Sequence, residues 1–166
     1  MKSLVIYYSY SGNTQKVADV LNSMLAQKGE ARIQRLLPAD ESDKFFAQCV
    51  RAFKHIRAVL PDEKFDLSEY DLICVGTPVW AFAPVPAINT FLDKCSGLNG
   101  KKVICFTTYG SGTGVKRCLA AIEKALKEKG VSGFYNFNIQ QGKAADKDFV
   151  ENTISKALQD ALADKA

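Results

Sequence analysis

The most informative segment of this chain lies near its beginning and reads Ser3-Leu4-Val5-Ile6-Tyr7-Tyr8-Ser9-Tyr10-Ser11-Gly12-Asn13-Thr14. Its first half is almost continuously apolar and rich in β-branched and aromatic side chains, which is typical of a central strand buried on both faces. Its second half is polar and leads into residues 14–28, where apolar positions recur at helical spacing and Gly29 provides a stop. The segment therefore predicts a strand, a tight loop and a crossover helix.

The same alternation of strand and helix patterns continues to the end of the chain. Further strands are expected at residues 31–37, 72–76, 103–106 and 134–139, and further helices at 45–60, 85–95, 115–129 and 146–163. The strand at 31–37 has charged neighbours, as an edge strand often does. The pattern predicts an α/β fold in which a parallel sheet of five strands is covered by helices on both faces. With 166 residues, a single domain spanning 1–166 is expected.

The segment between the second and third strands is too long for a bare loop, and its apolar positions predict a helix at residues 45–60. We expect the apolar side chains of this helix to pack inward, with the basic side chains on the other face. The basic residues are Lys44, Arg51, Lys54 and Arg57. An ordinary solvated surface is the expectation for them, and a docking site for an acidic partner is the alternative.

Composition excludes several classes of protein. The net charge of +4 comes from 22 basic and 18 acidic residues spread along the chain, so nothing recommends nucleic-acid binding. The five cysteines form no C-x-x-C pair and only one histidine is present, which disfavours a metal site and is typical of reduced core thiols in a cytoplasmic protein. No signal-peptide pattern follows Met1.

Residues 72–92 carry no charged side chain and are long enough to suggest a membrane span. The prolines at 78, 84 and 86 would interrupt a helix through this stretch. A buried strand, an apolar loop and the start of a helix fit it better, so no membrane partner is expected.

Ligands of open parallel sheets bind beyond the carboxyl ends of the strands. The loops expected there are residues 9–14, 77–84 and 107–114, and none of them contains a charged residue. General acids, general bases and metal ligands would put Asp, Glu, His or Lys on these loops, so we expect no catalytic residue and no metal. A response-regulator receiver, which needs acidic residues after its first and third strands, is excluded on the same ground.

The first of these loops has the features of a phosphate site. It offers the hydroxyls of Ser9, Ser11 and Thr14 and a row of backbone N–H groups at a helix N-terminus, which can hold a phosphate dianion without Lys or Arg. The alternative is that Ser11, Asn13 and Thr14 only cap the helix. A nucleotide-binding P-loop is not expected, because no Lys follows Gly12.

The other two loops favour a flat ligand. The glycines of residues 110–114 are spaced G-x-G-x-G after the fourth strand, which does not fit a dinucleotide-binding fingerprint. With Tyr109 beside them, an aromatic ring could cover a flat ligand while the backbone approaches its polar edge. Trp80 lies between Pro78 and Pro84, so we expect it in a rigid loop at this edge; burial between sheet and helices is the alternative.

Together these residues resemble the flavodoxin family. After the strand at residues 5–7, the residues Ser9, Gly12, Thr14, Ala18 and Leu21 stand at the intervals of the family signature, and residues 70–80 and 106–114 look like its second and third flavin loops. The resemblance implies a flavodoxin-like three-layer sandwich, with a doubly wound sheet of order 2-1-3-4-5 that holds one FMN non-covalently. The cofactor-binding residues that it implies are Ser9, Tyr10, Ser11, Gly12, Asn13, Thr14, Thr77, Pro78, Val79, Trp80, Ala81, Phe82, Thr107, Thr108, Tyr109, Gly110, Gly112 and Gly114.

In this assignment the phosphate lies on residues 9–14, and the flavin ring lies between residues 78–82 and the loop of Tyr109. Trp80 or Tyr109 is expected to stack on the ring. Two features depart from the family pattern. The chain is basic where typical flavodoxins are strongly acidic. No glycine stands between Val79 and Pro84, where several flavodoxins have one, so a peptide flip there is expected to be strained.

Three functions fit this reading. The expected one is an FMN-containing electron carrier of the cytoplasm that serves a redox partner protein or a small-molecule acceptor. The second is an FMN-dependent NAD(P)H oxidoreductase that acts on a quinone or another small acceptor, and the third is a flavin-free binding module that keeps the fold. An NAD(P)H oxidation assay separates the first two.

Overall fold

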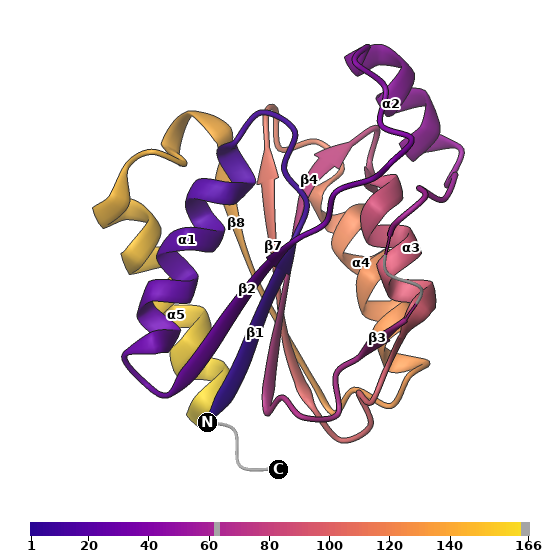
Figure 1. Ribbon diagram of the computed structural model, residues 1–166. Helices are drawn as coiled ribbons and strands as arrows, with labels where there is room; N and C mark the ends of the chain where they lie inside the picture. Colours follow the sequence, from indigo (N-terminus) through magenta and orange to yellow (C-terminus); the bar gives the residue numbers. More distant parts are fainter. Residues whose placement is uncertain (62–63, 164–166) are drawn as a thin grey trace.

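A central sheet of five parallel strands organises the molecule in the computed structural model, which describes residues 1–61 and 64–163 (Figure 1). The strands are β1 (Lys2–Tyr7), β2 (Glu30–Arg35), β4 (Leu72–Trp80), β7 (Lys102–Tyr109) and β8 (Gly133–Gln140). Their order across the sheet is β2-β1-β4-β7-β8. If these five strands are numbered 1 to 5 along the chain, their order is 2-1-3-4-5, as predicted. β2 lies at an edge, as the charged residues beside it indicated.

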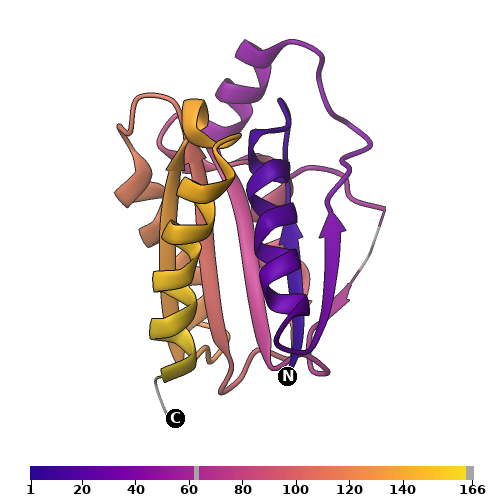
Figure 2. The ribbon, with the colours of Figure 1, turned by 90° about the vertical axis from the view of Figure 1, so that its left-hand side faces the viewer.

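Helices cover both faces of the sheet, as predicted (Figures 1 and 2). One layer holds α1 (Asn13–Ala26) and α5 (Lys147–Ala163), and the other holds α3 (Pro86–Lys94) and α4 (Val115–Lys127). Successive strand residues enter opposite cores. In β1, Val5 and Tyr7 pack under α1 and α5, whereas Leu4 and Ile6 pack on the other side. Burial on both faces is the reason why these strands read as continuous apolar runs.

The third predicted strand is longer than its apolar pattern indicated. β4 continues through Trp80 because β5 (Ala83–Pro84) pairs with it in antiparallel fashion, so residues 77–80 are strand rather than loop. The described chain also contains three short elements that the sequence did not predict. These are β3 (Phe65–Asp66), which pairs with β6 (Cys95–Ser96), and the 3-10 turn η1 (Gln141–Lys143). Pairing between two-residue strands leaves too little pattern in the sequence to be recognised.

The helix predicted at residues 45–60 is wrong in its length and in its orientation. α2 (Phe45–Phe53) ends early, and His55 just beyond it has a φ of 53°. The helix buries Gln48 and Ala52 and leaves its phenylalanines exposed. Figure 1 shows that α2 projects beyond the carboxyl edge of the sheet, so only part of the helix packs against the core, through Cys49 and Ala52. The buried amide of Gln48 is satisfied there by donating to the Ser42 carbonyl at 3.2 Å.

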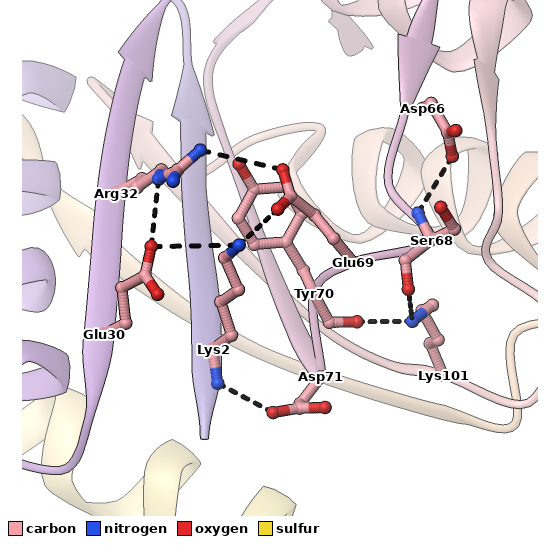
Figure 3. Close-up of polar contacts among 9 residues, drawn as sticks. All are labelled: Lys2, Glu30, Arg32, Asp66, Ser68, Glu69, Tyr70, Asp71 and Lys101. Carbon is pink, nitrogen blue, oxygen red and sulfur yellow. Dashed lines mark hydrogen bonds and ion pairs between the residues drawn. The ribbon is translucent and has the colours of Figure 1, made fainter.

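The amino edge of the sheet carries a cluster of alternating charges (Figure 3). Lys2 of β1 lies between Glu30 of β2 and Glu69, and Arg32 contacts the same two carboxylates. These side chains are partly exposed, so each pair contributes little to stability. The cluster nonetheless joins β1, β2 and the segment that leads into β4 at the end of the sheet opposite α2.

Residues 72–92 form β4, β5 and most of α3, which confirms the buried strand and the start of a helix predicted for this uncharged stretch, whereas most of the predicted apolar loop is a β-hairpin. No helix within residues 1–61 and 64–163 is long and apolar enough to cross a membrane. All five cysteines are free thiols and four are buried. Burial raises the pKa of Cys95 to about 11 and that of Cys118 to about 12, so these thiols stay protonated and unreactive.

Candidate functional site

A cavity of about 480 Å³ opens at the carboxyl edge of the sheet, a size that is typical of small-ligand and cofactor sites. The loops after β1 and β7 and the last residues of β4 all contribute to it. The cavity is lined by Tyr10, Ser11, Asn13, Thr14, Phe45, Pro78, Val79, Trp80, Thr108, Tyr109, Gly110, Ser111 and Gln141. The sheet topology therefore brings the three predicted loops together around one space.

The first loop does not use its polar side chains to cap the helix. α1 begins after Gly12, which has a φ of 83°, and no side chain of the loop accepts a capping hydrogen bond. The hydroxyl of Thr14 is instead 2.7 Å from that of Thr108, where the loops after β1 and β7 meet. The capping alternative therefore does not hold, and the N–H groups of the first helical turn lack a side-chain acceptor beside the cavity.

Ser9 contributes a buried hydroxyl without a partner. The residue is only 2% exposed, and its Oγ forms no hydrogen bond with any described residue. Its carbonyl accepts a hydrogen bond of 2.8 Å from Arg35 Nη2, which fixes the loop from behind. An unsatisfied buried hydroxyl is costly, so its presence in this loop points to a partner that comes from outside the chain.

The second wall of the cavity ends in a tight hairpin. Ala81 and Phe82 connect β4 to β5, and their φ values of 46° and 67° are both left-handed. Hairpins of this kind normally carry Gly, Asn or Asp at both positions, and an alanine or phenylalanine there costs about 1–2 kcal/mol. Gly114 permits the arrangement, because a Cβ at Gly114 would lie 2.7 Å from the Phe82 Cα.

Trp80 is both a core residue and part of the cavity wall. Its side chain is 6% exposed and meets the rings of Tyr8, Tyr10 and Phe45 edge-on, with centroids 5.6, 5.6 and 5.4 Å away. The prediction that Trp80 lies in a loop is therefore wrong. Trp80 is the last residue of β4, and its side chain is buried in the core, which was the alternative. The aromatic cluster nevertheless places its ring beside the space where a flat ligand would lie.

The third loop lines the cavity through its first residues only. Tyr109, at the end of β7, is half-buried, and the Cβ of a larger residue at Gly112 would lie 3.4 Å from its ring. Thr107 points elsewhere and donates to Asn138 Oδ1 at 2.8 Å. Gly112 therefore leaves space beside the Tyr109 ring but does not itself line the cavity.

Ten of the predicted site residues line the cavity and eight do not. The eight are Ser9, Gly12, Thr77, Ala81, Phe82, Thr107, Gly112 and Gly114. Three lining residues were missed in the prediction: Phe45, Ser111 and Gln141. Phe45 had been assigned to the inner face of α2. Gln141 follows β8, and because that strand ends at the same edge, its loop should have been considered with the others.

The electrostatics of the site agree with its uncharged sequence. None of the described residues that line the cavity carries a charge. Behind the wall, the Tyr8 hydroxyl donates to Glu41, and burial together with this carboxylate raises the pKa of Tyr8 above its ordinary value. The site can hold an anion on backbone N–H groups and cover a planar ring, and its described lining contains no Asp, Glu, His, Lys or Arg.

Comparisons with known proteins agree with this geometry. Residues 2–158 match a family model described as flavodoxin. A protein from Bacteroides uniformis ATCC 8492 that carries a provisional description as a flavoprotein is 25% identical, with a TM-score of 0.70 over 93% of this chain and 97% of that one.

Two further structures share the fold. A flavoprotein from Lactobacillus acidophilus NCFM, solved in complex with FMN, is 24% identical with a TM-score of 0.64, covering 88% of this chain and 97% of that chain. Flavodoxin 2 from Bacillus cereus is 22% identical with a TM-score of 0.58, covering 94% of this chain and 99% of that chain.

Proposed function

The chain belongs to the flavodoxin family, and from this we propose that it binds one FMN non-covalently in the cavity at the carboxyl edge of the sheet and transfers electrons through it. The observation that carries the proposal is the cavity itself. It has a helix N-terminus and the side chain of Ser11 at one side and aromatic side chains at the other, and the unpartnered Ser9 hydroxyl lies in the loop that leads into it. A phosphate and a flavin ring need these two environments.

Residues 9–14 would hold the phosphate. The hydroxyls of Ser9 and Ser11 are available as donors, and the Thr14 hydroxyl can turn from Thr108 toward the ligand. The first-turn N–H groups of α1 add further donors and the partial positive charge of the helix dipole. Arg35 supports this loop through the Ser9 carbonyl and does not line the cavity.

Tyr109 is the better of the two candidates for stacking on the flavin ring. Trp80 already contacts three aromatic rings and is nearly buried, whereas Tyr109 is half-buried and has a glycine beside its ring. The lining residues bind and orient the cofactor and exclude water, and bound FMN supplies the uptake and release of electrons. Since none of the described lining residues is cationic, negative charge gained on reduction is not offset by them, which favours a low reduction potential.

The partner of this chemistry is a redox protein or a small-molecule acceptor, in a reducing compartment such as the cytoplasm. The free thiols suit that compartment. The second candidate function is an NAD(P)H oxidoreductase acting on a quinone or another small acceptor. The observation that favours it is Phe45, an exposed aromatic residue at the cavity, together with the basic net charge that would attract a phosphorylated nicotinamide cofactor.

An anaerobic absorption experiment tests the proposal. The purified protein is titrated with FMN and, separately, with riboflavin, and the FMN complex is then treated with NADPH and finally with dithionite. Tight binding of FMN, weak binding of riboflavin and bleaching by dithionite alone are expected for a carrier. Bleaching by NADPH would establish the oxidoreductase, and a protein that takes up no FMN would overturn both.

A further inference from the structure

α2 leaves an aromatic face uncovered. Phe46 is 80% exposed, Phe53 61% and Phe45 52%, while the helix buries only Gln48 and Ala52. Single exposed apolar residues are common on proteins, but three phenylalanines on one short helix form a patch of the kind that marks interaction sites. We call these three phenylalanines, with Lys44 and Lys54 at the ends of the helix, the α2 face.

The α2 face does not serve the stability of its own helix. Lys44 occupies the N-cap, forms no capping hydrogen bond and places a positive charge at the positive end of the helix dipole. No acidic residue in the first turn offsets it. A helix that lacks an N-cap hydrogen bond and also exposes large apolar side chains is expected where function requires it.

The position of α2 connects this face to the proposed cofactor site. Phe45 lines the cavity and packs against Trp80, and the Tyr10 hydroxyl donates to the Asp43 carbonyl just before the helix at 2.9 Å. Figure 1 shows α2 beyond the carboxyl edge of the sheet, where the cavity opens. A protein that covered Phe46 and Phe53 would therefore stand next to the bound cofactor.

Charge indicates which kind of partner fits. Residues 44–60 contain four basic side chains and no acidic one. Arg51 is bound to Asp40 and Arg57 to Asp93, so both are held against the body of the protein. Lys44 and Lys54 are exposed, and neither is ion-paired with any described residue. Two exposed cations that form no ion pair with any described residue therefore stand at the ends of the aromatic patch, with the exposed Asp43 directly before Lys44.

We propose that the α2 face is a docking surface for an acidic electron-transfer protein, whose carboxylates meet the two lysines and whose apolar surface covers Phe46 and Phe53. The proposal rests on the function proposed above. In the complex, one electron leaves the reduced centre of the partner and enters the bound FMN. A second copy of this chain is a poorer occupant, because it would bring the lysines of both copies together. Anionic membranes are usually held by about four to eight basic residues, twice or more what α2 leaves free.

The test uses the FMN-loaded protein and a reduced, acidic [2Fe–2S] ferredoxin, with a basic c-type cytochrome as the opposite probe. Stopped-flow kinetics give the rate of electron transfer at low and at high salt, and calorimetry with the oxidised ferredoxin gives its affinity. The test variant is Lys44→Glu with Lys54→Glu. Its control is Lys28→Glu with Lys156→Glu, which makes the same change of net charge on exposed residues at the end of α1 and on α5.

The Lys44→Glu/Lys54→Glu variant is expected to lose about tenfold or more of the ferredoxin rate at low salt and most of its salt dependence. The control should stay within about twofold of the wild type. Phe46→Ser should weaken ferredoxin binding, whereas Phe149→Ser, at an exposed phenylalanine of α5, should not. FMN affinity should be unchanged in all four.

Four results would overturn the proposal. They are an equal loss in the control variant, faster reaction with the basic cytochrome, a dimer in sedimentation velocity that Phe46→Ser dissolves, and binding to anionic phosphatidylserine vesicles that Phe46→Ser abolishes. A wild-type protein that fails to bind FMN would instead overturn the proposed function, and with it the electron-transfer role of this surface. The calorimetric affinity for oxidised ferredoxin measures docking alone, so it distinguishes the two failures.

Discussion

Two buried serines show how much the surroundings of a single hydroxyl matter. Ser3 in β1 and Ser9 at the end of the same segment are both buried, and the Oγ of each lacks a hydrogen-bond partner among the described residues. Ser3 lies at the amino edge of the sheet and Ser9 directly before the cavity-lining loop. The same chemical defect therefore has different consequences at the two ends of one strand.

Ser9→Ala is expected to leave the stability of the FMN-free protein unchanged or to raise it, because the substitution removes an unsatisfied buried polar atom. It should weaken FMN binding by about 1–2 kcal/mol, because a phosphate oxygen then loses a donor. Thermal unfolding and fluorescence titration measure the two effects. Ser3→Ala is the matched control: it should stabilise similarly and leave FMN affinity alone. Weaker binding in both variants would contradict the role of Ser9.

Thr14→Val is expected to weaken FMN binding by about 1–3 kcal/mol, measured by the same titration. The substitution also removes the hydrogen bond to Thr108, so Thr108→Val is needed beside it. Thr108→Val breaks the same link between loops but keeps the hydroxyl on the phosphate loop. Equal losses in the two variants would assign the effect to the link rather than to a phosphate contact.

At this scale the sequence indicated which hydroxyls would gather at the site but not how each is satisfied. The loop pattern correctly indicated that Ser11 and Thr14 lie at the cavity, whereas Ser9 does not line it. The pairing of Thr14 with Thr108 joins residues 94 positions apart, and no local pattern encodes it. Trp80 was wrongly assigned to a loop for a related reason, because its burial depends on rings that come from two other segments, residues 8–10 and α2.

The hairpin of β4 and β5 is the element on which the second wall of the cavity depends. Its tip packs against the start of α4, where only a glycine leaves room for Phe82. Apart from α2, regular elements with a clear period were predicted within a few residues of their bounds. This hairpin was missed because Ala81 and Phe82 are not residues that indicate a turn, and their conformation is imposed by the packing around them.

Gly114→Ala is expected to lower the free energy of unfolding by about 2–4 kcal/mol and to weaken FMN binding. The alanine would have to keep an unfavourable positive φ, and its Cβ would also collide with Phe82. Gly100→Ala separates these two causes, because Gly100 has a φ of 72° but no atom within 4 Å of the added Cβ. Urea unfolding should show a loss of only about 1–2 kcal/mol for Gly100→Ala. Equal losses would mean that the contact with Phe82 is unimportant.

The orientation of α2 shows a second limit of sequence patterns. Its spacing correctly indicated a helix with an apolar face, but periodicity does not reveal whether another layer lies under that face. Here the chain carries the helix past the edge of the sheet, and its three phenylalanines are left exposed. The expectation failed in the region where the structure departs from its otherwise regular layers.

Across the whole molecule, the two edges of the sheet have different roles. The carboxyl edge carries an uncharged cavity, and the amino edge carries the ion-pair cluster of Figure 3. The helical layers were predicted correctly from long runs whose burial is nearly complete, and the order of the strands was predicted correctly from the resemblance to the flavodoxin family. The charged cluster was not predicted, because it joins residues from β1, β2 and the approach to β4.

Acid should destabilise the protein in part through this amino edge. The hydrogen bond from Lys2 lowers the pKa of Glu69, and the backbone N–H of Ser68 lowers that of Asp66. A lowered pKa means that the carboxylate stabilises the fold above its ordinary pKa, about 4, and that this contribution is lost as the pH falls through the lowered value. Urea midpoints measured between pH 7 and pH 3 should therefore fall less steeply for Glu69→Gln than for the wild type. A slope equal to that of the wild type would contradict this assignment.

The left-handed conformation of Ala81 and Phe82 at the hairpin tip affects the mobility of the backbone as well as its energy. A glycine there could exchange between two backbone conformations, but these two residues are held in one by the packing that overcomes their strain. The wall of the cavity is then a fixed scaffold whose dipoles need not rearrange when charge arrives. For the electron transfer proposed above, such a wall would contribute little to the reorganisation energy. The rate would then depend on the driving force and on how closely a donor can approach.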